Sequence, residues 1–230
     1  MLVDGGKPSD GDFVVDFIRE LGYARIDHVV MTHTHDDHIG GLINVLDNFE
    51  AGELWMSVYN ENTPLLLDFI TKVEEIGPSI KWVARDDAYE IDDVNVTILN
   101  PPKGSTLNRL GGPNGASIVI RFEYEATSIL LAADIDSSRD RELVNIYGDH
   151  LRGTVLKCAH HGSEISNSQQ FLTAVKPLIA IVSTGPSQYN YPSKITMARI
   201  EKMVPDVYRT DKDGTVIVIM DGENVSIKTR

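Results

Sequence analysis

Apolar residues recur along the chain at two spacings, and the spacing changes from one segment to the next. Between residues 13 and 21 they share one helical face, and Gly22 follows as a stop. The same spacing predicts further helices over 37–48, 64–76, 139–147, 169–175 and 195–204. The chain therefore contains several amphipathic helices, separated by shorter apolar runs.

Those shorter runs, rich in β-branched residues, are typical of strands. They cover residues 26–31, 54–58, 80–84, 89–91, 94–99, 117–123, 128–132, 155–159, 178–183, 206–209, 215–220 and 225–228. A long polar loop rich in Gly and Pro spans 101–115. The mixture predicts an α/β fold of two packed sheets with helices outside, a four-layer αββα arrangement. No linker interrupts it, so we expect one domain over 1–230.

Composition narrows the class of protein. The chain has 230 residues, 42% of them hydrophobic and 24% charged, as in a globular protein. It has no apolar run of membrane-spanning length, no signal-peptide pattern at its start, and a single cysteine, Cys158, which predict a cytoplasmic protein without an internal disulfide. The net charge of -13 argues against general coating of nucleic acid. A bound divalent ion could still attract one phosphate locally.

A cluster of metal-binding residue types follows the strand predicted over 26–31. His33 and His35 are two apart in an extended segment, so both can face one ion. Asp37 and His38 begin the next helix and can approach a neighbouring ion. Imidazole and carboxylate groups are common ligands of zinc, manganese and iron. The alternative, a polar loop with incidental histidines, requires a chance grouping of three histidines and two aspartates within residues 33–38.

The pattern His-x-His-x-Asp-His after a strand resembles the signature of the metallo-β-lactamase-fold hydrolases. Further landmarks appear in the order of that family. Asp4 is similar to the strand-end aspartate that supports the ligands from behind. Asp134 is similar to the aspartate that bridges two metals, and His160 or His161 to a late histidine ligand. The resemblance thus implies one or two divalent ions, zinc or manganese.

Adjacent side chains of a strand point in opposite directions, so we expect one of the two late histidines to be the ligand. We favour His160 as the ligand, with His161 either supporting the ligands or touching the substrate. His161 and a metal-bound water are the two candidates for the leaving-group acid. Asp134 follows an apolar run, where a carboxylate without a partner would be costly, and a metal explains it. Asp37 or Asp134 could orient the nucleophile.

A narrower resemblance is to the soluble domain of ComEC-type competence proteins and its stand-alone relatives. It rests on His160-His161-Gly-Ser, on Val182-Ser183-x-Gly185, on a Tyr208-Arg-Thr-Asp segment, and on Asn114-x-x-Ser117. Asn114 and Ser117 are expected to line the site near the first metal, or else to cap a loop. Members of this subgroup are thought to cut DNA, which implies phosphodiester chemistry.

The chain departs from the family pattern in three respects. No histidine lies between His38 and His150, although many members of the superfamily have a ligand there. Tyr191-Pro192 stands where relatives often carry His-Pro. The chain also starts near the second strand of the usual fold, so we expect the usual first strand pair to be missing. The missing histidine favours the ComEC-like subgroup. It also favours manganese over zinc as the expected metal.

These observations predict a metal-dependent hydrolase of phosphodiester bonds, of nuclease or phosphodiesterase type, that uses a metal-activated hydroxide. A single-stranded DNA or nucleotide substrate is expected. One alternative keeps the metals but acts on a lactam, lactone or thioester. The other is a non-catalytic metal-binding scaffold. Cationic groups near the metals would favour phosphate, and an apolar pocket would favour an acyl substrate.

Overall fold

The computed structural model describes residues 1–185 and 189–230. Its contacts divide the chain into two compact units. The first unit comprises residues 1–84 and 101–118, and the second comprises residues 85–100 and 119–230. Each unit contains one main sheet, and each is considered by itself below. The expectation of a single domain stays a prediction.

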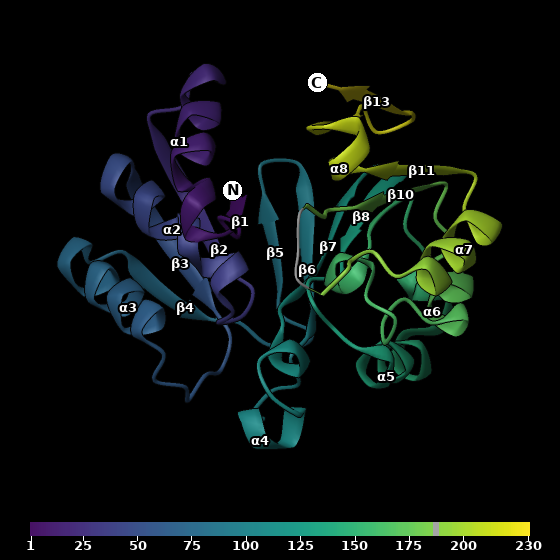
Figure 1. Cartoon of the computed structure of the whole chain (residues 1–230), viewed down its shortest axis with the longest axis horizontal. Helices are drawn as coiled ribbons and strands as arrows, with labels where there is room; N and C mark the ends of the chain where they lie inside the picture. The colour runs from purple at the N-terminus through teal and green to yellow at the C-terminus, as the bar shows by residue number, and fades with distance from the viewer. Residues whose placement is uncertain (186–188) are drawn as a thin grey trace. The chain divides into compact units, whose positions relative to one another are not determined.

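The first unit is built on a parallel sheet with the strand order β1-β2-β3-β4. Each connection between neighbouring strands is a helix, and successive helices contact one another along one face of the sheet (Figure 1). Crossover connections of one handedness explain this arrangement. When the strands of a parallel sheet follow one another in sequence order, such connections place every helix on the same side of the sheet. The elements are β1 (Leu2–Val3), α1 (Gly11–Glu20), β2 (Arg25–Met31), α2 (Asp36–Asn48), β3 (Glu50–Met56), α3 (Pro64–Ile76) and β4 (Ser79–Trp82).

Local signals in the sequence fix the ends of α3. The Thr63 hydroxyl accepts a hydrogen bond from the Leu66 amide, and Pro64 occupies the first helical position. Gly77 ends the helix with φ of 69°, a conformation that glycine adopts without a steric penalty. The predicted helix over 64–76 is therefore confirmed at both ends.

The second unit contains a seven-stranded sheet with the order β11-β10-β9-β8-β7-β6-β5. The strands β5 to β8 pair as antiparallel neighbours, and β8 to β11 pair in parallel. The strands are β5 (Ala88–Ile91), β6 (Val94–Asn100), β7 (Val119–Tyr124), β8 (Thr127–Leu131), β9 (Val155–Lys157), β10 (Ile179–Val182) and β11 (Asp206–Arg209). The long apolar runs at 155–159 and 178–183 arise because both faces of this sheet are covered.

Alternate residues of β9 and β10 enter two different cores. Leu156 and Ala180 face a core formed with α5 (Ser137–Tyr147), α6 (Gln169–Val175) and α7 (Lys194–Met203). Val155 and Ile179 face the opposite side, where the antiparallel pair β12 (Val216–Met220) and β13 (Val225–Thr229) packs. Figure 1 shows the three helices gathered on one side of this sheet.

The segment expected to be a polar loop over 101–115 contains a short helix, α4 (Leu107–Leu110). Leu107 and Leu110 are buried against Ala116 and Val58. Four residues are too few to produce a helical period in the sequence, which explains why the pattern did not predict this helix. The strand expected from residue 117 begins at Val119, and α8 (Thr210–Asp213) follows β11 directly.

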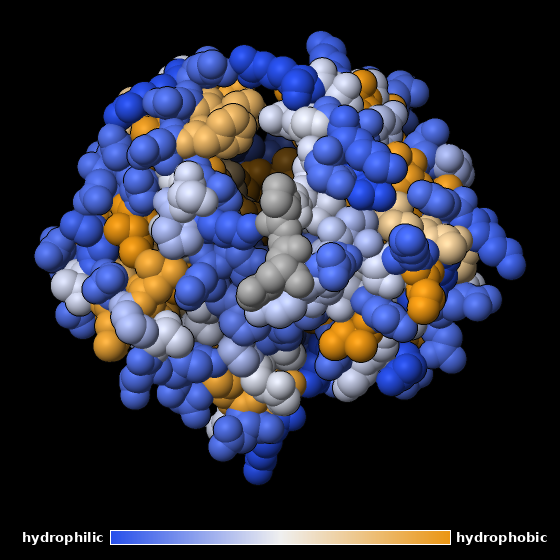
Figure 2. All heavy atoms as spheres, in the orientation of Figure 1, coloured by the Kyte–Doolittle hydropathy of each residue, from blue (hydrophilic) through white to orange (hydrophobic). Residues whose placement is uncertain are grey.

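The predicted α/β class is confirmed, since each unit pairs one main sheet with a layer of helices, the composition of an αββα sandwich. On the face drawn in Figure 2 hydrophilic side chains predominate, with smaller apolar groups between them. Within the described ranges no helix has both the length and the apolar character that a membrane crossing requires. The expected missing strand pair and the expected cytoplasmic location stay predictions.

Candidate metal site

The first histidine loop, residues 32–38, joins the end of β2 to the start of α2. It brings His33 and His35 together, with 3.1 Å between His33 Nε2 and His35 Nδ1. Nitrogen ligands held about 2.0–2.1 Å from one tetrahedral ion are about 3.3–3.4 Å apart. The two nitrogens thus have a separation close to that of ligands sharing one ion. His33 is only 2% exposed, so the pair is assembled inside the fold.

The carboxylate of Asp4 holds this loop in place through hydrogen bonds with Thr32 and His38. The Thr32 amide donates to Asp4 Oδ1 at 2.8 Å, and the Thr32 hydroxyl donates to Asp4 Oδ2 at 2.7 Å. His38 Nδ1 lies 2.7 Å from the same Oδ2. Because a carboxylate only accepts, His38 carries a proton on Nδ1, so in its neutral form its Nε2 is the unprotonated nitrogen. Nitrogen ligands of metals commonly have this second hydrogen bond.

The same reasoning fixes the tautomer of His33. The Thr32 hydroxyl already donates its proton to Asp4, so at 3.1 Å it accepts from His33 Nδ1. In its neutral form His33 therefore presents Nε2 as the unprotonated nitrogen toward His35. Asp4 thus sets the orientation of His38 directly and that of His33 through Thr32.

Burial by itself would raise the pKa of the Asp4 carboxyl. The neighbouring His38 and His33 and the hydrogen bond from the Thr32 amide outweigh burial, and the pKa lies below its usual value. The group is therefore an anion at neutral pH, as an orienting partner of two imidazoles must be.

Close backbone packing holds Asp4 in place beside α2. The Gly5 amide donates to the His38 carbonyl at 2.8 Å, and Asp4 itself has φ of 59°. A Cβ on Gly41 would lie 2.0 Å from the Gly5 carbonyl oxygen. Glycine at position 41 is therefore required for this approach, which explains the pair of glycines that follows the histidine motif.

Asp37 lies in the first turn of α2, where an acidic side chain also favours the helix dipole. Its carboxylate and a ring nitrogen of His38 lie within 4.8 Å of each other, and so do ring nitrogens of His33 and His38. The first unit thus brings together all four residues predicted from the motif. The neighbouring Asp36 is exposed.

Asn114 and Ser117 belong to the same unit and lie next to the first histidine loop. The Ile118 amide donates to the Thr32 carbonyl at 2.9 Å, which places buried Ser117 beside that loop. The Asn114 side-chain oxygen is buried and accepts no hydrogen bond from the described residues. A buried acceptor of this kind suits a water or a cation.

Glu61 is a residue of this site that the sequence did not indicate. Its Oε2 accepts a hydrogen bond from the hydroxyl of Thr34, the residue between His33 and His35, at 3.1 Å. Glu61 lies in the loop that follows β3, 27 residues away from Thr34 along the chain. A lone acidic residue in a polar loop has no distinguishing pattern, so no signal in the sequence could have identified it.

The second histidine loop, residues 158–163, lies in the second unit after β9. His161 Nε2 is 3.5 Å from Asp134 Oδ2, and His160 Nε2 is 3.8 Å from the same oxygen. His161 Nδ1 donates to the Ser183 carbonyl at 2.8 Å, so in the neutral form of the ring Nε2 is the unprotonated nitrogen. The Tyr191 hydroxyl is 3.4 Å from His160 Nε2. Asp134 is 2% exposed.

The backbone explains why both imidazoles reach one carboxylate. His160 and His161 have φ of 50° and 51°, and Gly162 follows with φ of 77°. The sequence-based argument assumed a strand, in which neighbouring side chains diverge. The strand ends at Lys157 instead, and the left-handed turn that follows turns both rings toward Asp134.

The buried side chain of Asn167 anchors this turn. Its Oδ1 accepts from the Ala159 amide at 2.8 Å, and its Nδ2 donates to the Ala159 carbonyl at 2.9 Å. Arg199 donates to the Asn167 carbonyl at 2.9 Å. Asn167 is fully buried, and it clamps the residue that immediately precedes His160. The sequence analysis did not identify this role.

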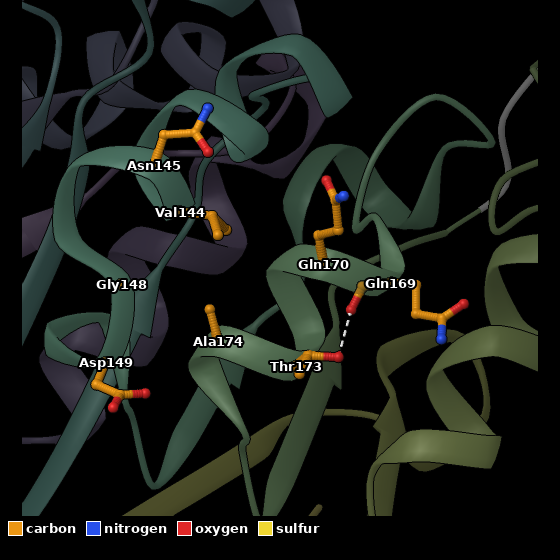
Figure 3. A pocket seen from close by; sticks show the side chains of 8 residues that line it. All are labelled: Val144, Asn145, Gly148, Asp149, Gln169, Gln170, Thr173 and Ala174. Carbon is orange, nitrogen blue, oxygen red and sulfur yellow. Dashed lines mark hydrogen bonds between the residues drawn. The ribbon is translucent and has the colours of Figure 1, made fainter.

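A cavity of about 680 Å³ lies elsewhere in the second unit, between α5 and α6. Figure 3 shows its lining, in which the Thr173 hydroxyl donates to the Gln169 carbonyl at 2.8 Å. Its walls also include Asn145, Asp149 and Gln170, and none of the predicted site residues lines it. It is therefore separate from the histidine loops and has no ligand set of its own.

The buried imidazole and carboxylate groups on these α/β sheets are the donor types of a metal-dependent hydrolase. The family model of the Metallo-beta-lactamase superfamily matches residues 1–185, and the chain belongs to this superfamily. The resemblance stated from the sequence motifs is thereby confirmed. The donor set fits the divalent metal ions that this superfamily typically binds.

Among curated proteins, the chain is similar to ComE operon protein 3 of Bacillus subtilis (strain 168). The two are 26% identical over 204 residues, 88% of this chain and 26% of that protein. Competence protein ComA of Neisseria gonorrhoeae is 26% identical over 207 residues, again 88% of this chain and 26% of that protein. The chain spans about a quarter of the length of these relatives.

Two solved structures show a similar fold. The metallo-beta-lactamase fold protein YhfI from Bacillus subtilis has a TM-score of 0.53 at 12% identity, covering 91% of this chain and 83% of that one. CmlA, a diiron beta-hydroxylase from Streptomyces venezuelae, has a TM-score of 0.51 at 12% identity, covering 81% and 44%. Identities this low support the fold and leave the substrate to be argued from the site.

Proposed function

We propose that this chain is a metal-dependent phosphodiesterase of nuclease type that acts on single-stranded DNA or nucleotides. The observation that carries the hydrolase part is the paired geometry of His33 and His35, backed by the buried Asp4 network. The phosphodiester part is supported by the similarity to competence proteins.

We propose that each unit supplies ligands for divalent metal ions, zinc or manganese. Support comes from the order of the motifs along the chain and from membership of the superfamily. In the first unit His33 and His35 would hold one ion, and Asp37 and His38 the other. The second unit would contribute Asp134 and one of its two histidines.

Of those two histidines, we assign His161 as the ligand. Its Nδ1 is held by the Ser183 carbonyl, so its Nε2 faces Asp134, the arrangement typical of metal-binding imidazoles. His160 is paired with the Tyr191 hydroxyl and could move a proton to the leaving group. This assignment reverses the preference for His160 that the sequence suggested.

Divalent ions bound there would lower the pKa of a water molecule and stabilise the charge that develops on the phosphoryl group. The residues of the chain supply orientation. Asp4 fixes the imidazoles of His33 and His38, so that no reorganisation is needed as the substrate binds. Asp37 or Asp134 would accept a hydrogen bond from the attacking nucleophile and so orient it.

Hydrolysis of bis-p-nitrophenyl phosphate, measured after chelation and again after adding zinc or manganese, tests this function. We expect added metal to restore activity, and His35→Ala to lower kcat/KM more than about 100-fold, beyond the usual cost of losing an outer partner. His150→Ala, which removes an exposed histidine, is the matched control.

The same preparations should be assayed with a lactam, a lactone and a thioester. Metal-restored turnover of one of these, without phosphodiester turnover, would replace the proposed function with acyl hydrolysis. Bound metal without any turnover would favour the non-catalytic scaffold.

A further inference from the structure

Three aromatic rings of the second unit form a stack that runs outward from the second histidine loop. The rings of His161 and Tyr191 have centroids 6.2 Å apart and planes 24° from parallel. The rings of Tyr191 and Tyr189 continue at 5.7 Å and 26°. These are offset-stacked arrangements, which aromatic rings prefer over face-to-face contact.

The two ends of this stack lie in different surroundings. At the inner end, His161 Nε2 is 3.5 Å from the buried carboxylate of Asp134. The Tyr191 hydroxyl reaches His160, so the middle ring also contacts the histidine loop. At the outer end, Tyr189 is 65% exposed. The stack of three rings therefore extends from the candidate catalytic groups to solvent.

An exposed ring beside such a site is suited to a substrate that has flat rings of its own. Each nucleobase presents a π-face, so stacking on tyrosine binds single strands with little regard to sequence. Lys194, three residues after Tyr191 along the chain, is an exposed cation at the start of α7. The net charge of -13 opposes long polyanions, and it leaves short single strands as the favoured class.

We propose that Tyr189 and Tyr191 form a binding subsite for a nucleobase of a short single-stranded oligonucleotide. The base stacked on Tyr189 would belong to a nucleotide that flanks the phosphodiester to be cleaved. This inference rests on the proposed function, since it names the substrate group that lies beside the reacting phosphate.

The test compares two ligands of equal charge. The affinities of the full chain for a fluorescent thymidine hexamer and for an abasic deoxyribose-phosphate hexamer are measured by anisotropy, in the presence of calcium. Wild type should bind the thymidine hexamer about tenfold more tightly, the effect expected from one base stacked on an aromatic ring. Tyr189→Ala should remove this preference and leave the affinity for the abasic hexamer unchanged, whereas Tyr189→Trp should keep it.

Tyr23→Ala is the matched control, because Tyr23 is 63% exposed and belongs to the other unit. Equal affinity of wild type for both hexamers, binding of neither, or the same loss in Tyr23→Ala would overturn the subsite. Failure of the subsite and failure of the proposed function give different experimental results. Phosphodiester turnover without a base preference refutes the subsite alone, and a Tyr189-dependent base preference without turnover refutes the hydrolase alone.

Discussion

The two histidine loops orient their imidazoles with different partners. In the first loop a buried anion, Asp4, accepts from His38 and, through Thr32, controls His33. In the second loop a neutral backbone carbonyl, that of Ser183, accepts from His161. A carboxylate partner makes an imidazole a stronger base and ligand than a carbonyl does. The first loop should therefore dominate metal affinity, and it should be the more sensitive to charge.

The loops also differ in what holds their backbones. The first continues a strand into a helix, and its special requirements are close backbone contacts at Gly41 and Gly40 and the positive φ of Asp4. The second needs three successive residues with positive φ, and the side-chain amide of Asn167 holds it through two hydrogen bonds to the backbone of Ala159. Regular structure thus positions the first loop, whereas a side-chain clamp positions the second.

Among changes to the residues that support the two loops, removal of the charge on Asp4 should lower metal affinity the most. Asp4→Asn keeps the shape of the side chain but weakens both orienting contacts, and we expect metal affinity to fall by about 10- to 100-fold. Isothermal titration of the metal-free protein with zinc and manganese measures the change. An unchanged affinity would show that the carboxylate does not orient the ligands.

Loss of the clamp in the second loop should have a smaller effect on the metal. Asn167→Ala leaves the buried Ala159 amide without its acceptor, which should cost about 1–3 kcal/mol of stability. We expect metal affinity to fall about tenfold as the histidine turn loosens. Urea unfolding and metal titration are measured on the same samples.

Ser168→Ala provides the control for Asn167→Ala. It removes the cap at the start of α6, at a cost of about 1 kcal/mol, and it does not touch Ala159. If Ser168→Ala weakens metal binding as much as Asn167→Ala does, general destabilisation explains both, and the clamp has no special role.

The anion in the first loop also predicts a dependence of stability on pH. The folded pKa of Asp4 lies below its usual value of 3.8, so its stabilising contribution is full above that pH and is lost as the pH falls through the folded pKa. In metal-free protein the melting temperatures of wild type and Asp4→Asn should differ at pH 6 and converge toward pH 3. A constant difference across this range would contradict the ionised role of Asp4.

The smallest effect is expected from Thr34→Val, which removes the hydrogen bond to Glu61 and keeps the volume of the side chain. We expect a loss of about 1 kcal/mol in stability and a change in metal affinity of less than about threefold. Thermal unfolding and metal titration check both values. A loss of metal binding as large as that of Asp4→Asn would make Glu61 a principal support of the site.

The sequence predicted the first loop well because its geometry follows from regular structure. His33 and His35 share one side of an extended segment, and His38 begins a helix, so their spacing alone brings them together. The fold class could be predicted for the same reason, since hydrophobic spacing distinguishes helices from strands.

Contacts that depend on an irregular backbone could not be predicted. The turn at His160 and His161 was taken for the end of a strand, because no residue pattern distinguishes a left-handed turn of histidines. Glu61 and Asn167 lie in irregular loops and contact their partners only in the folded chain. Such contacts produce no periodic pattern of residues in the sequence. The short helix α4 is hidden within a polar segment for the same reason.

The central claim is that each of the two histidine loops supplies ligands to bound metal. Bound zinc or manganese per chain, measured by mass spectrometry on wild type, His35→Ala, His161→Ala and the control His150→Ala, tests it most directly. We predict one or two ions in wild type and in His150→Ala, and a clear loss of bound metal in each of the other two variants. A His161→Ala variant that retained all of its metal would contradict the claim, because the first loop would then bind the ions alone.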